Sequence, residues 1–328
     1  MKNEEDFFMF STSAVQRTTV LLSAMLGMTA AWGFLRLPGA NMLMVVFTFL
    51  ASAFLMDVSS FRRRLKMTVI LSLYASAVQF LITVWTEFPL GQMIAATFSA
   101  YFVFSTLPDL RAGCIVMITG YLAFFAPCIS EEAVSRSMDI LIGGAVVMIV
   151  TTLCHARKTD QSQVTVSPSP VSRRRCFYLA AALGTGNLLF RLLQLQQGPW
   201  IMLTVLFITM AETPENPGKK LAFQRIFAVP AGILFGGFLL EIFSRTDQRL
   251  VYLIPFLGAI GFFLLYDQGD FFLFSLFFMV TLTFFSDWMT GPYHRFHFWD
   301  ILFSRTLSSF LGAICFLIFN FYGTRRTV

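Results

Sequence analysis

The amino-acid sequence predicts an all-α polytopic membrane protein, and three observations support this. Hydrophobic residues make up 56% of the 328 residues, whereas charged residues make up only 13%. Soluble domains are usually about 45–50% apolar and about 25% charged. The apolar residues also fall into successive runs of roughly 18 to 24, each long enough to cross the hydrocarbon core of a bilayer.

Charged or Pro- and Gly-rich breaks divide these runs into about twelve predicted transmembrane helices. The helix over 199–211 is short and is followed by the polar stretch AETPENPGKK, so we expect it to be interrupted or to begin earlier. The predicted limits are 17–35, 41–57, 67–86, 90–107, 112–129 and 136–154 in the first half of the chain, then 177–195, 199–211, 221–243, 250–266, 270–287 and 299–322 in the second.

The distribution of Lys and Arg orients the predicted helices. If the N-terminus lies in the cytoplasm, most of the 24 Lys and Arg residues face the cytoplasm, as the positive-inside rule requires. An even number of helices then places both the N and C termini in the cytoplasm. The N-terminal stretch lacks the basic, apolar and small-residue regions of a removable signal peptide.

A polar segment at the midpoint separates two halves that resemble each other. This segment, HARKTDQSQVTVSPSPVSRRR, is rich in Ser, Pro and Gln and is typical of a flexible tether. LSAMLG at 22–27 corresponds to LAAALG at 179–184. We therefore predict two parallel six-helix membrane repeats joined by a cytoplasmic linker, a construction common in transporters. The predicted domains are 1–156, the linker 157–175, and 176–328.

The sixth helix of each predicted repeat carries an arginine followed at i+7 by a glycine. The pairs are Arg136 with Gly143 and Arg305 with Gly312. Seven residues make nearly two turns, so the two side chains share one helix face about 10.5 Å apart. Because glycine allows close helix approach, we expect each arginine to face a packing seam near the outer boundary. Each arginine either attracts an organic anion or has a structural role. The structural role is that of a snorkelling anchor or of an ion pair, for which Asp139 has suitable spacing from Arg136.

The third helix of the second half and two carboxylates are further candidates. Arg225 precedes Gly232 and Gly236, which form a GxxxG packing seam. We interpret Arg225 as a substrate contact, and ordinary helix packing is the alternative. Asp139 and Asp300 flank the arginine motifs and are candidates for proton coupling, because carboxylates within a membrane often carry protons. The alternative for such residues is a solvated helix end.

Several classes of function lack their sequence signature. The basic residues gather at helix ends, so the net charge of +6 does not indicate nucleic-acid binding. The sequence has no Walker or HExxH motif, and the five cysteines show no CxxC pairing. His294 and His297 form an HxxH pattern without a third strong ligand. We therefore expect no metal, no cofactor and no enzymatic activity.

Three segments of the second half resemble the fusaric acid resistance-like, or aromatic acid exporter, superfamily. They are GPWIMLTVLFI, KKLAFQRIFAVPAGILFGG and SRTLSSFLGAICFLI. Trp200 corresponds to the tryptophan that opens the second helix of the family repeat. Arg225 with Gly232 corresponds to the third-helix motif, and Arg305 with Gly312 to the sixth-helix motif. The first half matches more weakly, and only a short linker stands where many full-length members carry a cytoplasmic domain.

The resemblance implies a bacterial inner-membrane exporter of small aromatic carboxylic acids, driven by protons and working with a periplasmic adaptor protein. Arg136, Arg225, Arg305 and Trp200 are then the predicted contacts of the organic anion. Membrane lipid is an expected partner, and self-association stays open. A non-transporting membrane scaffold of an envelope complex is the main alternative. A lipid-modifying membrane enzyme is a weaker one, because no catalytic cluster is recognisable.

Overall fold

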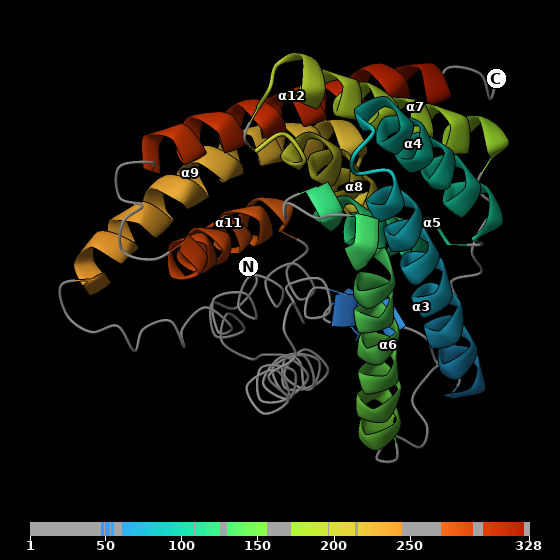
Figure 1. Ribbon diagram of the computed structural model, residues 1–328. Coiled ribbons are helices and arrows are strands. Elements are labelled where there is room, and N and C mark those ends of the chain that lie inside the picture. The colour runs from blue at the N-terminus through green and yellow to red at the C-terminus, as the bar shows by residue number, and fades with distance from the viewer. Residues whose placement is uncertain are drawn as a thin grey trace, which may run out of the picture.

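The protein is all-helical throughout the part of the chain that its computed structural model describes (Figure 1). The predicted helices over 17–35 and 250–266 lie outside this part, as do His294 and His297 and most of the linker. The predicted helix over 41–57 is described only in part. The described residues are 47–48, 50–52, 54–55, 61–107, 109–124, 130–155, 172–195, 197–213, 216–244, 270–290 and 298–324.

The observed helices follow the predicted ones closely, and the two largest differences are the early end of α5 and the early start of α3. Helix α3 begins at Phe61, because the basic residues that follow extend it beyond the apolar run. The helices are α3 (Phe61–Val84), α4 (Pro89–Thr106), α5 (Leu110–Tyr121), α6 (Ala133–His155), α7 (Arg173–Leu192), α8 (Trp200–Ala211), α9 (Gly218–Ser244), α11 (Phe271–Thr290) and α12 (Phe298–Thr324), with 3₁₀ segments η2 (Leu122–Phe124) and η3 (Ser130–Glu132) before α6.

Polar residues at the breaks fix where several helices begin. The Asp109 side chain accepts a hydrogen bond from the backbone N–H of Arg111 at 2.8 Å and caps α5. Ser172 caps α7 in the same way through the N–H of Arg175. A side-chain acceptor at this position satisfies N–H groups that have no partner within the helix. The sequence breaks are therefore also helix starts.

The described helices differ in whether they are long enough to cross a membrane. Within that part of the chain, three helical stretches are long and apolar enough to cross a membrane: Phe61–Val84, Gly218–Ile242 and Leu302–Tyr322. By contrast, α5 and α8 are apolar but have only 12 residues each. A helix of 12 residues is about 18 Å long, well short of a hydrocarbon core of about 30 Å. The short α8 agrees with the predicted limits of 199–211 and does not begin earlier, whereas α5 ends before the predicted helix over 112–129 does.

The two short helices lie against each other in the interior of the bundle. Every residue of α5 from Ala112 to Tyr121 is buried, as is every residue of α8 from Trp200 to Thr209. α5 also packs on α3 and α4, while α8 packs on α7, α9 and α12. A helix that is apolar on all sides belongs in such an enclosed position.

Helices at corresponding places in the two halves make corresponding contacts. In the first half, α3 contacts α5 and α6, and in the second half α9 contacts α11 and α12. Figure 1 shows α9, α11 and α12 gathered on one side of the molecule and α3 beside α6 on another. This pairing is what two copies of one unit require. The two-repeat organisation stays a prediction, because the helices predicted over 17–35 and 250–266 lie outside the described residues.

Large apolar side chains cover the outward faces of the long helices. Leu73 of α3, Phe98 of α4, Phe227 of α9 and Phe303 of α12 are each more than half exposed. Apolar surface this extensive is a liability in water but is favourable against lipid tails. Together with the membrane-length helices, it describes a multi-pass membrane protein.

Glycines bring the helices of the second half into close contact. A Cβ atom at Gly312 of α12 would meet the carbonyl oxygen of Ile201 on α8. A Cβ atom at Gly232 of α9 would lie 2.5 Å from the carbonyl oxygen of Leu276 on α11, and one at Gly236 would lie 3.0 Å from Cβ of Thr283. These are the close approaches that small residues permit in membrane helices.

In the first half, the corresponding approach is made one residue later than the motif suggests. Gly143 of α6 is buried, but it is Gly144 whose Cβ atom would collide with the Ser72 side chain of α3. The two sixth helices therefore present their glycines in slightly different registers.

Replacing Gly232 with alanine should destabilise the protein. The added methyl group would press on a backbone oxygen of α11, which cannot move aside as a side chain can, at a cost of about 1–3 kcal/mol. Thermal unfolding of the purified protein in detergent measures the effect. Gly237→Ala is the matched control, because Gly237 is partly exposed on the same helix. Equal unfolding midpoints for the two variants would contradict the prediction.

Candidate functional site

The guanidinium of Arg225 is buried in the interior of the second half, and none of the described carboxylates pairs with it. Its side chain is 0% exposed, so it cannot reach the membrane surface. Nη1 donates a hydrogen bond to the Ser275 hydroxyl of α11 at 3.1 Å. The guanidinium carbon lies 5.0 Å from the ring centroid of Phe207 on α8. Nε and Nη2 have no hydrogen-bond partner among the described residues, and no described carboxylate pairs with this arginine.

This arrangement is costly for the folded protein when no anion is bound. Removing an ion from water costs several kcal/mol even after the protein relaxes. A desolvated cation–π contact returns about 2 kcal/mol, and one hydrogen bond to a hydroxyl returns less. The remaining penalty would be relieved by an anion that accepts hydrogen bonds from Nε and Nη2.

Arg305 of α12 is held by a different set of partners. It is 6% exposed, and its Nε donates to Oε1 of Gln197 at 3.2 Å. The guanidinium carbon lies 5.4 Å from the ring centroid of Trp200. The same oxygen of Gln197 accepts a hydrogen bond from the Trp200 indole N–H at 3.1 Å. Gln197 thus fixes the arginine and the tryptophan relative to each other.

Aromatic rings connect the two arginines along α8. Trp200 and Phe207 are seven residues apart on this helix and therefore share a face about 10.5 Å apart. Phe278 of α11 contacts both, with ring centroids 6.5 Å from Trp200 and 5.2 Å from Phe207, in edge-to-face geometry. We call Arg225, Arg305, Trp200, Phe207 and Phe278 the arginine–aromatic site. It combines cations with the flat apolar surfaces that aromatic ligands prefer.

The structure brings together three of the four predicted substrate contacts. Arg225, Arg305 and Trp200 belong to the arginine–aromatic site, where each contacts a side chain from another helix or from the segment before α8. Sequence reasoning missed Gln197, Phe207 and Phe278. Gln197 has a recognisable signal, because it stands three residues before Trp200 and directly before the motif that contains it. The two phenylalanines have none, because they are two among 40 in the chain.

Arg136, the fourth predicted contact, has a counter-ion of its own. It lies on α6, which packs on α3, and its Nη2 pairs with Glu132 at 2.8 Å. Its Nε donates to the same carboxylate oxygen at 3.0 Å. The ion pair expected as the structural alternative is therefore made with Glu132, four residues earlier, and not with Asp139. The structure gives Arg136 no role in the arginine–aromatic site.

The two candidates for proton coupling differ in burial. Asp139 of α6 is 9% exposed and lies one turn from Arg136. Asp300 is exposed in the first turn of α12, where a carboxylate interacts favourably with the helix dipole. Asp139 thus has the surroundings of an intramembrane carboxylate, whereas Asp300 has those of a solvated helix end. Within the described residues, no group of three or more His, Cys, Asp and Glu could hold a metal ion.

The apolar outer faces and the membrane-length helices define a multi-pass membrane protein. Residues 182–319 match the family model described as "Fusaric acid resistance protein-like". The match includes Trp200, Arg225 and Arg305, and it confirms the predicted resemblance over this part of the chain. No curated protein and no solved structure matches the chain.

Replacing Arg225 with methionine should raise the stability of the protein in buffer that lacks organic anions. Methionine fills a similar volume without a charge to desolvate, and such replacements of buried ions are neutral or stabilising by about 1–4 kcal/mol. Thermal unfolding in detergent tests this, with Arg305→Met as the control because Gln197 already satisfies part of that guanidinium. A lower unfolding midpoint for Arg225→Met than for the unmodified protein would instead indicate a structural role.

Proposed function

We propose that this protein exports small aromatic carboxylic acids across the bacterial inner membrane. The family match supports a transporter or resistance-type function in general terms. The observation that carries the more specific proposal is the buried guanidinium of Arg225, which has no counter-ion among the described residues and lies against the ring of Phe207. An aromatic carboxylate offers what this site lacks, a negative charge attached to a flat apolar ring.

The atoms of Arg225 that lack partners are suited to a carboxylate. Nε–H and Nη2–H point in the same direction from one edge of the guanidinium, so a carboxylate can accept both hydrogen bonds at once. Arg136 uses the same two atoms to hold Glu132. Arg136 therefore shows the contact that Arg225 would make with the carboxylate of a bound substrate.

The rings of Phe207 and Phe278 supply the apolar part of the proposed site. They lie edge to face with their centroids 5.2 Å apart, and the Phe207 ring lies next to the guanidinium. A substrate ring would enter between or beside them and gain the stacking that aromatic pairs prefer. Trp200 lies on α8 nearly two turns from Phe207, and Arg305 of α12 contacts it. These two residues would form a second binding position for the transported acid.

In the proposed transport cycle, the two six-helix repeats rock against each other around this path. The contacts of α4 with α7 and of α5 with α8 join the two halves and would form the pivot. Proton movement through Asp139 would supply the energy, and a periplasmic adaptor would carry the substrate onward. Self-association of the protein is compatible with this cycle but is not required by it.

Removing the charge of Arg225 should reduce export of an aromatic carboxylate by about tenfold or more, because a hydrogen bond to a charged group is worth about 1.5–3 kcal/mol. Arg225→Gln is compared with Arg225→Lys, which keeps the charge but loses the two-pronged contact and should be intermediate. Arg63→Gln on the exposed start of α3 is the control for a lost charge. The assay is efflux of benzoate-like acids from cells that produce each variant in equal amounts.

The same variants separate transport from the scaffold alternative. If Arg225→Gln and Arg305→Ala lose export while abundance and association with other envelope proteins are normal, transport is supported. Loss of abundance alone would indicate that these arginines maintain the fold.

Asp139→Asn should uncouple export from the proton gradient. An amide cannot take up and release a proton, so export by this variant should be slow and should no longer respond to a pH gradient imposed on membrane vesicles. Asp300→Asn is the matched control, because Asp300 is exposed at the start of α12. Export by the unmodified protein that persists after the gradient collapses would overturn the coupling proposal.

A further inference from the structure

The guanidinium of Arg191, near the end of α7, is held by neutral side chains. Its Nη2 donates a hydrogen bond to Oε1 of Gln92 on α4 at 2.6 Å, and its Nε donates to Oδ1 of Asn187 at 3.2 Å. The guanidinium carbon lies 5.8 Å from the ring centroid of Phe190. None of the described carboxylates pairs with Arg191. The acceptors that hold this cation therefore carry no negative charge.

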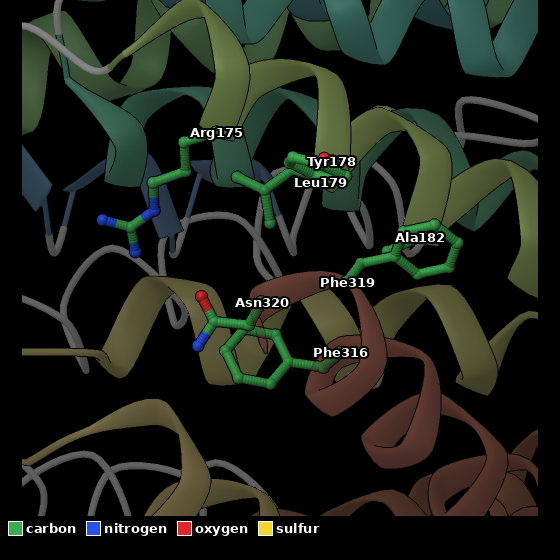
Figure 2. A pocket seen from close by; sticks show the side chains of 7 residues that line it. All are labelled: Arg175, Tyr178, Leu179, Ala182, Phe316, Phe319 and Asn320. Carbon is green, nitrogen blue, oxygen red and sulfur yellow. The ribbon is translucent and has the colours of Figure 1, made fainter. Parts of the chain in front are cut away.

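The arginine at the other end of α7 has a carboxylate partner. Arg175 pairs with Glu212 at 2.5 Å. Figure 2 shows it beside the side chains that α7 and α12 turn toward each other, among them Leu179 and Phe316, which are buried. The start of α7 is thus fixed within its own half of the protein by an ion pair and by close packing. Within the described residues, the end that carries Arg191 has no such ion pair.

The hydrogen bond between Arg191 and Gln92 joins the two halves of the chain. Gln92 is 5% exposed. Its amide nitrogen donates to the carbonyl oxygen of Ile82 in α3 and to the hydroxyl of Thr86 in the turn that follows, at 3.3 Å each. These two bonds leave the amide oxygen to face the guanidinium. Gln92 is therefore a positioning residue that links the first half to Arg191.

The seam between α4 and α7 runs antiparallel and is held differently along its length. Near the start of α7, the thiol of Cys176 donates to the carbonyl oxygen of Phe104 at 3.1 Å. In the middle, a Cβ atom at Gly184 would lie 2.9 Å from the Thr97 hydroxyl oxygen, so the helices are in close contact there. The bond from Arg191 to Gln92 closes the far end. If that bond is lost, this end of the seam can open while the rest stays packed.

This end of α7 adjoins the arginine–aromatic site. A Cβ atom at Gly198 would collide with the Phe190 ring, so that ring lies against the segment before α8. The preceding residue, Gln197, accepts hydrogen bonds from Arg305 and from Trp200. A ligand that leaves the arginine–aromatic site past Gln197 therefore meets this end of α7 next.

A carboxylate would be a better partner for Arg191 than the amide oxygen that it has. Hydrogen bonds between a guanidinium and a carboxylate are roughly twice as strong as bonds between neutral groups. Arg191 is partly exposed, so an anion can reach it without unfolding the helix. Asn187 beside it is 0% exposed, and its Nδ2 has no hydrogen-bond partner among the described residues. The guanidinium and this amide together offer more donors than their present neighbours accept.

We propose that Arg191 is an anion contact at the exit end of the transport path, and that the carboxylate of the transported acid displaces Gln92 from it. Loss of the bond between Arg191 and Gln92 frees this end of α4 from α7, so the departing anion opens its own way out. The inference rests on the proposed export of aromatic acids and adds the step at which the two halves separate. In the predicted orientation, this end of α7 faces away from the cytoplasm.

Gln92→Glu tests the exchange directly. The new carboxylate has the shape of the amide and would hold Arg191 by a charge-assisted bond, so the transported acid no longer displaces it. We expect export of benzoate to fall about tenfold, the difference between a neutral and a charge-assisted hydrogen bond. The unfolding midpoint in detergent should stay the same or rise. Gln194→Glu is the matched control, because it adds the same charge at an exposed position directly after α7, and it should export normally.

A distance measurement shows whether the two helices separate. Spin labels are attached at Leu90→Cys and Leu192→Cys, which are 66% and 69% exposed at this end of α4 and α7, after the native cysteines are replaced with alanine. Benzoate should shift the distances in the full-length protein to longer values, whereas the same concentration of chloride should not. Benzoate should leave the distances unchanged in Gln92→Glu. Arg191→Gln should show the longer distances without benzoate.

The inference is overturned if Gln92→Glu exports benzoate as fast as Gln194→Glu does, or if benzoate leaves the distances in the labelled protein unchanged. In that case the unmodified protein still exports benzoate, whereas failure of the proposed function means that no form of the protein exports it. If no form does, the distances alone decide. A shift with benzoate that is absent with chloride then supports the anion contact, and equal responses to the two anions overturn it.

Discussion

The contact between the guanidinium of Arg225 and the ring of Phe207 is the constraint around which the second half of this protein is built. A cation with no carboxylate partner can be buried only where the surroundings supply negative potential, and the face of an aromatic ring does so. Three helices contribute to this arrangement, because the arginine comes from α9, the ring from α8 and the Ser275 hydroxyl from α11. Gly232 lets α9 approach α11 closely enough for the hydroxyl to reach the arginine.

The two halves of the chain use similar motifs for different chemistry. Arg136 and Arg305 occupy corresponding places in the sequence, each seven residues before a glycine. Arg136 is neutralised by Glu132, whereas Arg305 is held by the neutral oxygen of Gln197 and by the ring of Trp200. Because Glu132 lies one turn before Arg136, the motif of the first half carries its own counter-ion. In the second half, the cation is supported by neutral and aromatic groups.

Much of the fold could be predicted from the sequence, because a chain segment inside a lipid bilayer must satisfy its backbone hydrogen bonds internally and therefore forms a helix. Apolar runs bounded by charges or by prolines become helices, and Trp200–Ala211 differs from the expected limits by a single residue. The early end of α5 at Tyr121 could not be predicted, because the next residues are equally apolar and only backbone hydrogen bonding distinguishes them.

The candidate site could be predicted for its charges but not for its rings. A single arginine in an apolar stretch is conspicuous, so Arg225 and Arg305 stood out. Phe207 contacts Arg225, and Phe278 contacts both Phe207 and Trp200. In sequence, however, these two phenylalanines resemble others such as Phe227 that face outward. Which of these rings turns inward depends on how the helices pack, and no local pattern encodes that. The partner of Arg136 was missed for a related reason, because Glu132 lies in a short 3₁₀ segment just before the helix.

The shortness of α5 and α8 has an electrical consequence. A membrane voltage falls across the insulating layer, and a thinner layer concentrates the same voltage into a stronger field. Two enclosed helices of 12 residues span only about 18 Å between their ends, so wherever water reaches those ends the field along them exceeds the field in the surrounding lipid. An anion that passes between Trp200 and Phe207 would then cross a large share of the membrane voltage in a displacement of only about two helical turns.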